Sequence, residues 1–179
     1  EIDYSLRKNW DLYWLIDPID GTKEFIKKGN DYTINIALCS RNLPVFSIVY
    51  APARAEMFTA EKNNGAFKNG KKITINTNRD KSLNIVASKS HMNFETTEYI
   101  NRINKKYKVN LLQFGSSLKI CKVAEGVADI YPRFGPTMEW DTCAADLIVC
   151  EAGGRIFDVN NEQLTYNKPN LLNPFFIVS

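Results

Sequence analysis

The chain has 179 residues, of which 44% are hydrophobic and 24% charged, and its 23 Lys and Arg against 20 Asp and Glu give a formal net charge of +3. This composition is ordinary for a globular protein and excludes a disordered chain, a collagen-like repeat and a coiled coil. No apolar run approaches the roughly 18–20 residues that span a bilayer, so an integral membrane protein is excluded as well. The basic residues are scattered, and we therefore expect no nucleic acid polymer as a partner.

The first half of the chain is predicted to be mainly antiparallel sheet. The predicted elements are a short buried strand at 13–16, a helical turn at 23–28, and strands at 32–40, 45–50 and 56–59. A turn is expected at 42–44, and Asn64-Gly65 and Asn69-Gly70 are typical of hairpins. Residues 32–75 are therefore predicted to form an antiparallel meander.

The second half alternates strands with helices. The predicted strands are at 83–87, 109–113, 127–131, 155–158 and 175–178, and the predicted helices are at 93–106, from a cap at Ser116 to 125, and from Asp141 to the Gly153-Gly154 pair. This alternation favours an α/β layered region after an α+β opening part. We expect two domains, 1–80 and 81–179, divided somewhere within residues 78–82.

Residues 17–22, with the sequence DPIDGT, carry the first candidate site. Two aspartates lie three residues apart at a strand end, and Pro18 stiffens the link. Like charges held close repel each other, and a bound divalent cation relieves that repulsion. The carbonyl of Ile19 is a further candidate ligand, and free N–H groups at Gly21 and Thr22 attract phosphate at a helix start. An ordinary turn with a helix cap is the alternative interpretation.

Any metal bound here is predicted to be a hard cation. His91 is the one histidine of the chain, which excludes a His-rich zinc site and favours Mg²⁺ on carboxylate oxygens. Asp141 follows Trp140 far downstream and, taken alone, is interpreted as a helix cap. Taken with Asp17 and Asp20, it is a candidate third carboxylate that would join the two halves of the chain.

Residues 14–22 and 140–154 together resemble the inositol monophosphatase superfamily, whose motif is Asp-Pro-x-Asp-Gly-Thr followed later by Trp-Asp and a small-residue helix ending in Gly-Gly. Four further stretches look like the branch of CysQ-type 3'(2'),5'-bisphosphate nucleotidases: 23–25, 49–52, 115–119 and 131–137. The resemblance covers residues 13–179. It implies a layered αβαβα sugar-phosphatase-like fold of the α/β (α+β) class, here lacking the N-terminal helices.

The resemblance implies an enzyme that uses Mg²⁺ to remove the 3'-phosphate of adenosine 3',5'-bisphosphate, giving AMP and phosphate. Such enzymes are inhibited by lithium and clear a by-product of sulfate assimilation. The implied metal ligands are the carboxylates of Asp17, Asp20 and Asp141 and the carbonyl of Ile19. Asp17 and Thr22 are the implied catalytic residues, with the Thr22 hydroxyl orienting the attacking water. A cation bound there neutralises the phosphate and activates water, which agrees with the implied reaction.

The implied substrate-binding residues are Asp20, Gly21, Thr22, His91, Ser116, Lys119, Arg133 and Asp141. Ser116 and Lys119 lie one helical turn apart and share a face, and Arg133 can hold a phosphate bidentately. His91 matches a position near the adenine. The alternatives are a helix cap, a solvated lysine, a surface arginine and a loop histidine.

The sequence departs from the family pattern at its beginning. Family members carry a Gly-Glu-Glu or Ser-Glu-Glu element that supplies a further metal-binding glutamate, and upstream of Tyr13 the only candidate is Glu1. We therefore expect weak metal binding and little turnover from this chain alone. The alternative functions are an inositol monophosphatase and a non-catalytic nucleotide-binding fragment. We expect a cytoplasmic location, either free or peripheral at the inner membrane face; the oligomeric state stays open.

Overall fold

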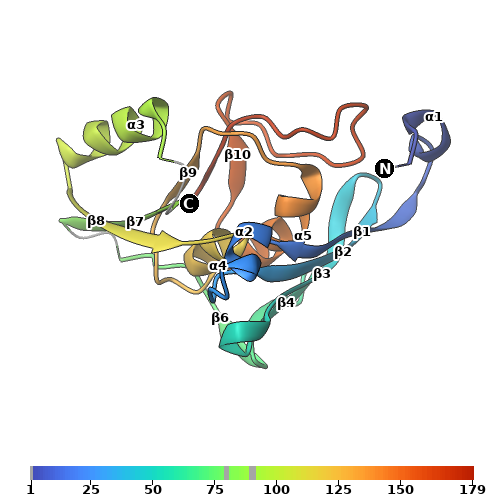
Figure 1. Ribbon diagram of the computed structural model, residues 1–179, viewed down its shortest axis with the longest axis horizontal. Coiled ribbons are helices and arrows are strands. Elements are labelled where there is room, and N and C mark those ends of the chain that lie inside the picture. The colour runs from blue at the N-terminus through green and yellow to red at the C-terminus, as the bar shows by residue number, and fades with distance from the viewer. Residues whose placement is uncertain (1, 79–80, 89–91) are drawn as a thin grey trace.

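The molecule combines a six-stranded antiparallel sheet with a second part in which helices and shorter strands alternate (Figure 1). The computed structural model describes residues 2–78, 81–88 and 92–179. The strands are β1 (Leu12–Asp20), β2 (Thr33–Ser40), β3 (Leu43–Ala51), β4 (Glu56–Glu61), β5 (Gly65–Lys68), β6 (Lys71–Ile73), β7 (Ser82–Ser88), β8 (Lys108–Phe114), β9 (Tyr131–Arg133), β10 (Ile156–Asp158) and β11 (Phe176–Val178). The helices are α1 (Tyr4–Arg7), α2 (Thr22–Ile26), the 3-10 helix η1 (Pro52–Arg54), α3 (Phe94–Asn104), α4 (Leu118–Ala124) and α5 (Glu139–Glu151).

Strands β1 to β6 lie side by side in sequence order and are all antiparallel, so the predicted meander is confirmed and β1 joins it. The β2–β3 turn lies one residue earlier than predicted. Arg41 and Asn42 have φ angles of 48° and 66°, the left-handed pair that a tight hairpin needs, and β3 already begins at Leu43.

The predicted burial of the first strand is wrong, because β1 is an edge strand of the sheet with one exposed face. Trp14 is 55% exposed and Ile16 is 51% exposed. Tyr13 and Leu15 point the other way and pack against the core, where α5 covers the sheet. Within the described residues, the opposite face of β1 therefore presents apolar side chains without a covering layer.

The second part contains two small sheets. Strands β7 and β8 are parallel, and β10, β11 and β9 form an antiparallel sheet that an Ile85–Ile130 bridge connects to β7. The strand predicted at 127–131 is displaced to β9. The N–H groups of Val127 and Ala128 still donate to the Lys122 carbonyl, 3.0 and 2.9 Å away, so this segment closes the end of α4.

Two helix starts also differ from the predictions. The residue before α4 is Ser117 rather than Ser116, which adopts a left-handed φ of 45° that a helix does not allow. Helix α5 begins at Glu139, so Asp141 lies inside its first turn. Its Oδ2 accepts the Met138 N–H at 2.8 Å, so the predicted capping interaction is made from the third helical position.

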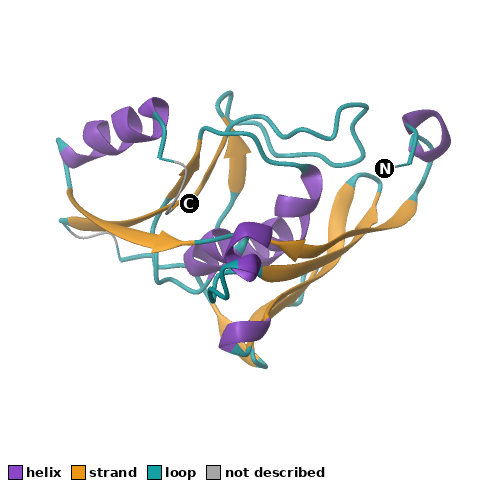
Figure 2. Cartoon of the chain, viewed as in Figure 1, coloured by secondary structure: helices purple, strands orange, loops and turns teal. Residues whose placement is uncertain are grey.

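The elements stack in layers, with α4 and α5 between the six-stranded sheet and the strands β7 to β11, and α3 on the far side (Figure 2). One hydrophobic core cluster includes residues of both halves, from Ala37 to Val178. The boundary near residue 80 stays a prediction. None of the helices in the described ranges combines the length and the hydrophobicity of a bilayer-spanning segment.

Candidate active site

An irregularity in β1 brings its two aspartates to one face of the sheet. Side chains alternate along a strand, so residues three apart normally point to opposite faces. Here Asp17 pairs with Asn35 and Asp20 pairs with Thr33, which means that three steps along β1 match two steps along β2. The extra residue restores the common face. Asp17 Oδ1 accepts the Ile19 N–H at 3.0 Å, which shapes this turn of the chain.

The first turn of α5 supplies the third carboxylate. Carboxylate oxygens of Asp17, Asp20 and Asp141 all lie within 4.8 Å of one another, although more than 120 residues separate the first two from the third. The predicted convergence of the three aspartates is therefore confirmed.

The cluster is electrostatically strained when no cation neutralises it. Burial, followed by the charge of Asp20, raises the pKa of Asp141 to about 6. Burial also raises the pKa of Asp17 and of Asp20, and the Asp20 charge adds to the effect on Asp17. Three close acids whose charged forms destabilise one another are a donor set that suits a hard divalent cation. The residues present therefore fit such an ion.

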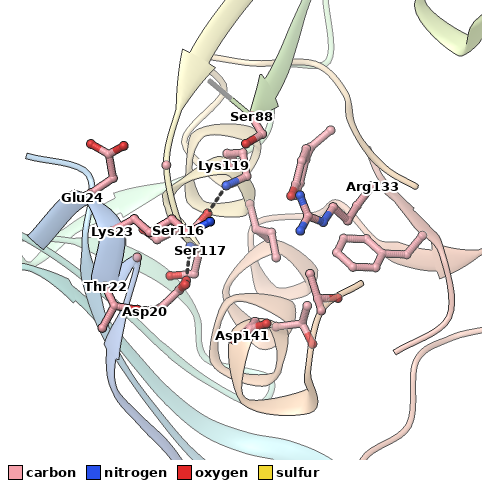
Figure 3. A pocket seen from close by; sticks show the side chains of 17 residues that line it. Asp20, Thr22, Lys23, Glu24, Ser88, Ser116, Ser117, Lys119, Arg133 and Asp141 are labelled. Atoms are coloured by element: carbon pink, nitrogen blue, oxygen red, sulfur yellow. Dashed lines mark hydrogen bonds between the residues drawn. The ribbon is translucent and has the colours of Figure 1, made fainter. Parts of the chain in front are cut away.

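Asp20 and Asp141 face a pocket of about 240 Å³ (Figure 3). The pocket is lined by Asp20, Gly21, Thr22, Lys23, Glu24, Ser88, Gly115, Ser116, Ser117, Lys119, Ile120, Tyr131, Arg133, Thr137, Asp141, Thr142 and Phe176. Gly21 has a φ of 83°, and a Cβ there would lie 3.0 Å from the Asp31 carbonyl, so a side chain is excluded by both strain and space. Thr22 follows as the first residue of α2.

The opposite end of the pocket is basic. Lys119 is only 6% exposed, and its Nζ donates to the Ser116 carbonyl at 2.7 Å and lies 5.5 Å from the centre of the Tyr131 ring. Burial lowers the pKa of Lys119 to about 8, against the opposing effect of the Asp20 charge. Arg133 donates from Nη2 to the Pro136 carbonyl at 2.9 Å, and its Nε is buried with no hydrogen-bond partner among the described residues.

The structure thus brings seven of the predicted site residues to one pocket: Asp20, Gly21, Thr22, Ser116, Lys119, Arg133 and Asp141. Asp17 reaches the same place through the carboxylate cluster. Ser116 directs a buried hydroxyl into this region that has no hydrogen-bond partner in the described part of the chain. The carbonyl of Ile19 as a ligand stays a prediction. His91 lies outside the described residues.

Two polar residues that sequence reasoning missed hold Asp20. The Ser117 N–H donates to Asp20 Oδ2 at 2.7 Å (Figure 3). The Ser117 hydroxyl donates to Asn35 Oδ1, also at 2.7 Å. The side chain of Asn35 in turn hydrogen-bonds to Asp20 and lowers its pKa, against the dominant effect of burial. A polar Asn between Ile34 and Ile36 in a predicted strand was the available indication of this role.

Comparison with known proteins agrees with this geometry. The sequence profile of the inositol monophosphatase family matches residues 2–174. The chain is 41% identical over 179 residues to the 3'(2'),5'-bisphosphate nucleotidase CysQ of Salmonella typhimurium, with 98% of this chain and 71% of that protein covered. A protein of the same name from Haemophilus influenzae is 40% identical, with 99% of this chain and 67% of that protein covered.

Solved structures of inositol monophosphatase family members also resemble this chain along nearly its whole length. The chain superposes on CysQ from Bacteroides thetaiotaomicron with a TM-score of 0.94 and 42% identity, which covers 100% of this chain and 73% of that one. An IMPase of Thermotoga maritima superposes with a TM-score of 0.80 and 28% identity, which covers 96% of this chain and 65% of that one.

Proposed function

The chain belongs to the inositol monophosphatase family, and from that premise we propose that it is a Mg²⁺-dependent phosphatase that removes the 3'-phosphate of adenosine 3',5'-bisphosphate. The observation that carries the proposal is a cluster of three carboxylates, two of which line the same pocket as Lys119 and Arg133. A substrate with two phosphates matches a site with two separate means of holding phosphate. The relatives named 3'(2'),5'-bisphosphate nucleotidase support this choice of substrate.

At the acidic end, Asp17, Asp20 and Asp141 would hold the cation through their carboxylates, with the Ile19 carbonyl as a further ligand. When bound, Mg²⁺ supplies the positive charge that neutralises a phosphate and activates water. The protein contributes the orientation of these ligands. The Ser117 amide and the Asn35 side chain hold Asp20, and the Met138 amide holds Asp141.

Around the reacting phosphate, the backbone at Gly21 and Thr22 would position the phosphate oxygens, and the Thr22 hydroxyl would orient the attacking water, with Asp17 beside it. At the basic end, Lys119 and Arg133 would bind the phosphate that is retained in the product. The unpartnered Ser116 hydroxyl and Arg133 Nε supply hydrogen-bonding groups for the nucleotide.

The test compares phosphate release from adenosine 3',5'-bisphosphate, adenosine 3'-monophosphate and inositol 1-phosphate at a fixed Mg²⁺ concentration. We expect kcat/KM to be highest for the bisphosphate and AMP to be its product. The ratio of rates is decisive because it compares the substrates on the same protein and does not depend on the absolute rate.

Equal kcat/KM for the bisphosphate and inositol 1-phosphate would contradict the substrate assignment and favour an inositol monophosphatase. Calorimetric binding of the bisphosphate without turnover would instead indicate a nucleotide-binding protein without catalysis.

A further inference from the structure

Asp31 is a buried carboxylate that does not line the pocket. It lies between α2 and β2 and is 1% exposed. Its Oδ1 accepts from Nε of Arg54 at 3.1 Å and also from Nη2, while its Oδ2 accepts the Gly115 N–H at 3.0 Å. One carboxylate therefore joins η1, which carries Arg54, to the loop that leads from β8 into α4.

Both turns that carry pocket residues pack directly against Asp31. A Cβ on Gly115 would lie 2.7 Å from the Asp31 Cβ and 2.7 Å from its carbonyl oxygen. A Cβ on Gly21 would lie 3.0 Å from the same carbonyl oxygen. The two glycines thus let the α4 loop and the turn after β1 both approach the Asp31 backbone more closely than a side chain would allow.

The residues immediately after Gly115 make the contacts that hold the pocket side chains. The Ser116 carbonyl accepts from Lys119 Nζ, and the Ser117 amide donates to Asp20, each at 2.7 Å. A shift of Gly115 along the chain direction would therefore displace an anchor of the basic end and an anchor of the acidic end together.

Arg54 holds the same loop at a second point. Its guanidinium lies 5.5 Å from the centre of the Phe114 ring, and Phe114 is the residue before Gly115. Its Nε also donates to the Asn30 carbonyl at 3.2 Å. Because the Arg54 side chain is 29% exposed, its removal leaves a group at the edge of the core rather than a large internal cavity.

We propose that Asp31 and Arg54 form a positioning pair that fixes the α4 loop against the turn at Gly21, so that Asp20 and Lys119 keep their relative places. The proposal rests on the proposed function for its kinetic consequences. Neither residue is a catalytic residue, because neither contacts the substrate. Asp31 acts on the loop through the Gly115 N–H, and Arg54 acts on it through the Phe114 ring. Loss of the pair weakens binding of the cation and of the nucleotide while kcat at saturation changes less.

The test measures KM for adenosine 3',5'-bisphosphate, the Mg²⁺ concentration for half-maximal rate, and kcat, all below the unfolding temperature. For Arg54→Ala we expect KM and the half-maximal Mg²⁺ concentration to rise about 3- to 10-fold. Arg54→Lys keeps the charge beside Asp31 but loses the second donor and the stacking on Phe114, so it is expected to restore only part of the loss. Asp31→Asn, which has the same shape but no charge, is expected to resemble Arg54→Ala.

Lys68→Ala is the matched control. Lys68 is 24% exposed, pairs with Glu56 and Glu125 at 3.0 and 2.6 Å, and does not line the pocket. It is expected to lower the unfolding temperature without raising either concentration. The proposal is overturned if Arg54→Ala, like Lys68→Ala, changes only the unfolding temperature.

A calorimetric Mn²⁺ titration of the same variants separates this inference from the proposed function. If the unsubstituted chain releases no phosphate from any substrate, the proposed function fails. Weaker Mn²⁺ binding by Arg54→Ala, with partial rescue by Arg54→Lys, would still support the positioning pair, and unchanged Mn²⁺ binding would refute it.

Discussion

The two ends of the pocket are organised in opposite ways. At the acidic end, three carboxylates are held by backbone amides; burial raises the pKa of each, and the nearby charge of Asp20 raises the pKa values of Asp17 and Asp141 further. At the basic end, Lys119 and Arg133 each donate to a carbonyl, and the two side chains come from different elements. The acidic end therefore needs a bound ion to relieve its repulsion, whereas the basic end is positioned before any ligand arrives.

The largest effect is expected where one of the three acids is neutralised. Asp141→Asn keeps the side-chain shape and an acceptor for the Met138 N–H but removes one carboxylate from the cluster. We expect the rate of phosphate release to fall by at least about 100-fold, because the proposed function makes Asp141 a direct ligand of the cation. A colorimetric phosphate assay at saturating substrate measures it.

Asp146→Asn is the matched control, since Asp146 lies on the same helix but is buried beside Tyr166 and Cys150, away from the pocket. It is expected to keep the rate of the unsubstituted chain. Equal activity in the Asp141 and control variants would show that Asp141 serves only as a helix cap.

A smaller effect is expected at the basic end, where Arg133→Ala removes a charge that we propose contacts the substrate but leaves the carboxylate cluster intact. We expect KM for adenosine 3',5'-bisphosphate to rise about 10- to 100-fold, the loss typical of a charge-assisted hydrogen bond to phosphate. The KM for inositol 1-phosphate, which has no second phosphate, should change little. An equal rise for both substrates would place Arg133 at the reacting phosphate instead.

The smallest effect on activity is expected for Asp146→Asn, which instead changes how the stability of the folded protein depends on pH. Burial raises the pKa of Asp146 to about 7, against the opposing hydrogen bonds from Tyr166 and Cys150. The unfolded chain has an ordinary aspartate pKa of about 3.9, so the folded state binds this proton more tightly and loses stability as pH rises from about 4 to about 7. Asp146→Asn lacks this titration.

Thermal unfolding at pH 4.5 and pH 8 checks the expectation. The unfolding temperature of Asp146→Asn minus that of the unsubstituted chain should be higher at pH 8 than at pH 4.5. The cluster of Asp17, Asp20 and Asp141 is common to both proteins, so it cancels in the difference. A difference in unfolding temperature that is the same at both pH values would mean that Asp146 is charged in the folded protein at both.

Sequence reasoning predicted the residues of the site better than the way in which they are held. The repulsion of two nearby aspartates and the resemblance to a known motif were enough to propose a cluster with Asp141. The irregularity that turns Asp17 and Asp20 to one face is defined by register with β2, which local pattern does not contain. The roles of Ser117 and Asn35 depend on the same packing of distant segments.

For the fold, too, local sequence predicted some features, and others depend on tertiary packing. Hairpin turns, most strands and the alternation of the second half follow from local sequence. The burial of β1 was predicted wrongly because an apolar run does not reveal whether one or both faces are covered, and here Trp14 and Ile16 are open. The displaced start of α4 has a comparable cause, because Ser116 and Ser117 are chemically identical and the local sequence does not reveal that Ser116 takes a left-handed φ of 45°.

The central claim is that three aspartates from two distant segments form one divalent-cation site, and a calorimetric titration with Mn²⁺ at pH 7.5 tests it most directly. The account predicts saturable binding by the unsubstituted chain, weakened at least about tenfold in Asp141→Asn and unchanged in Asp146→Asn. Identical binding curves for all three proteins would contradict it.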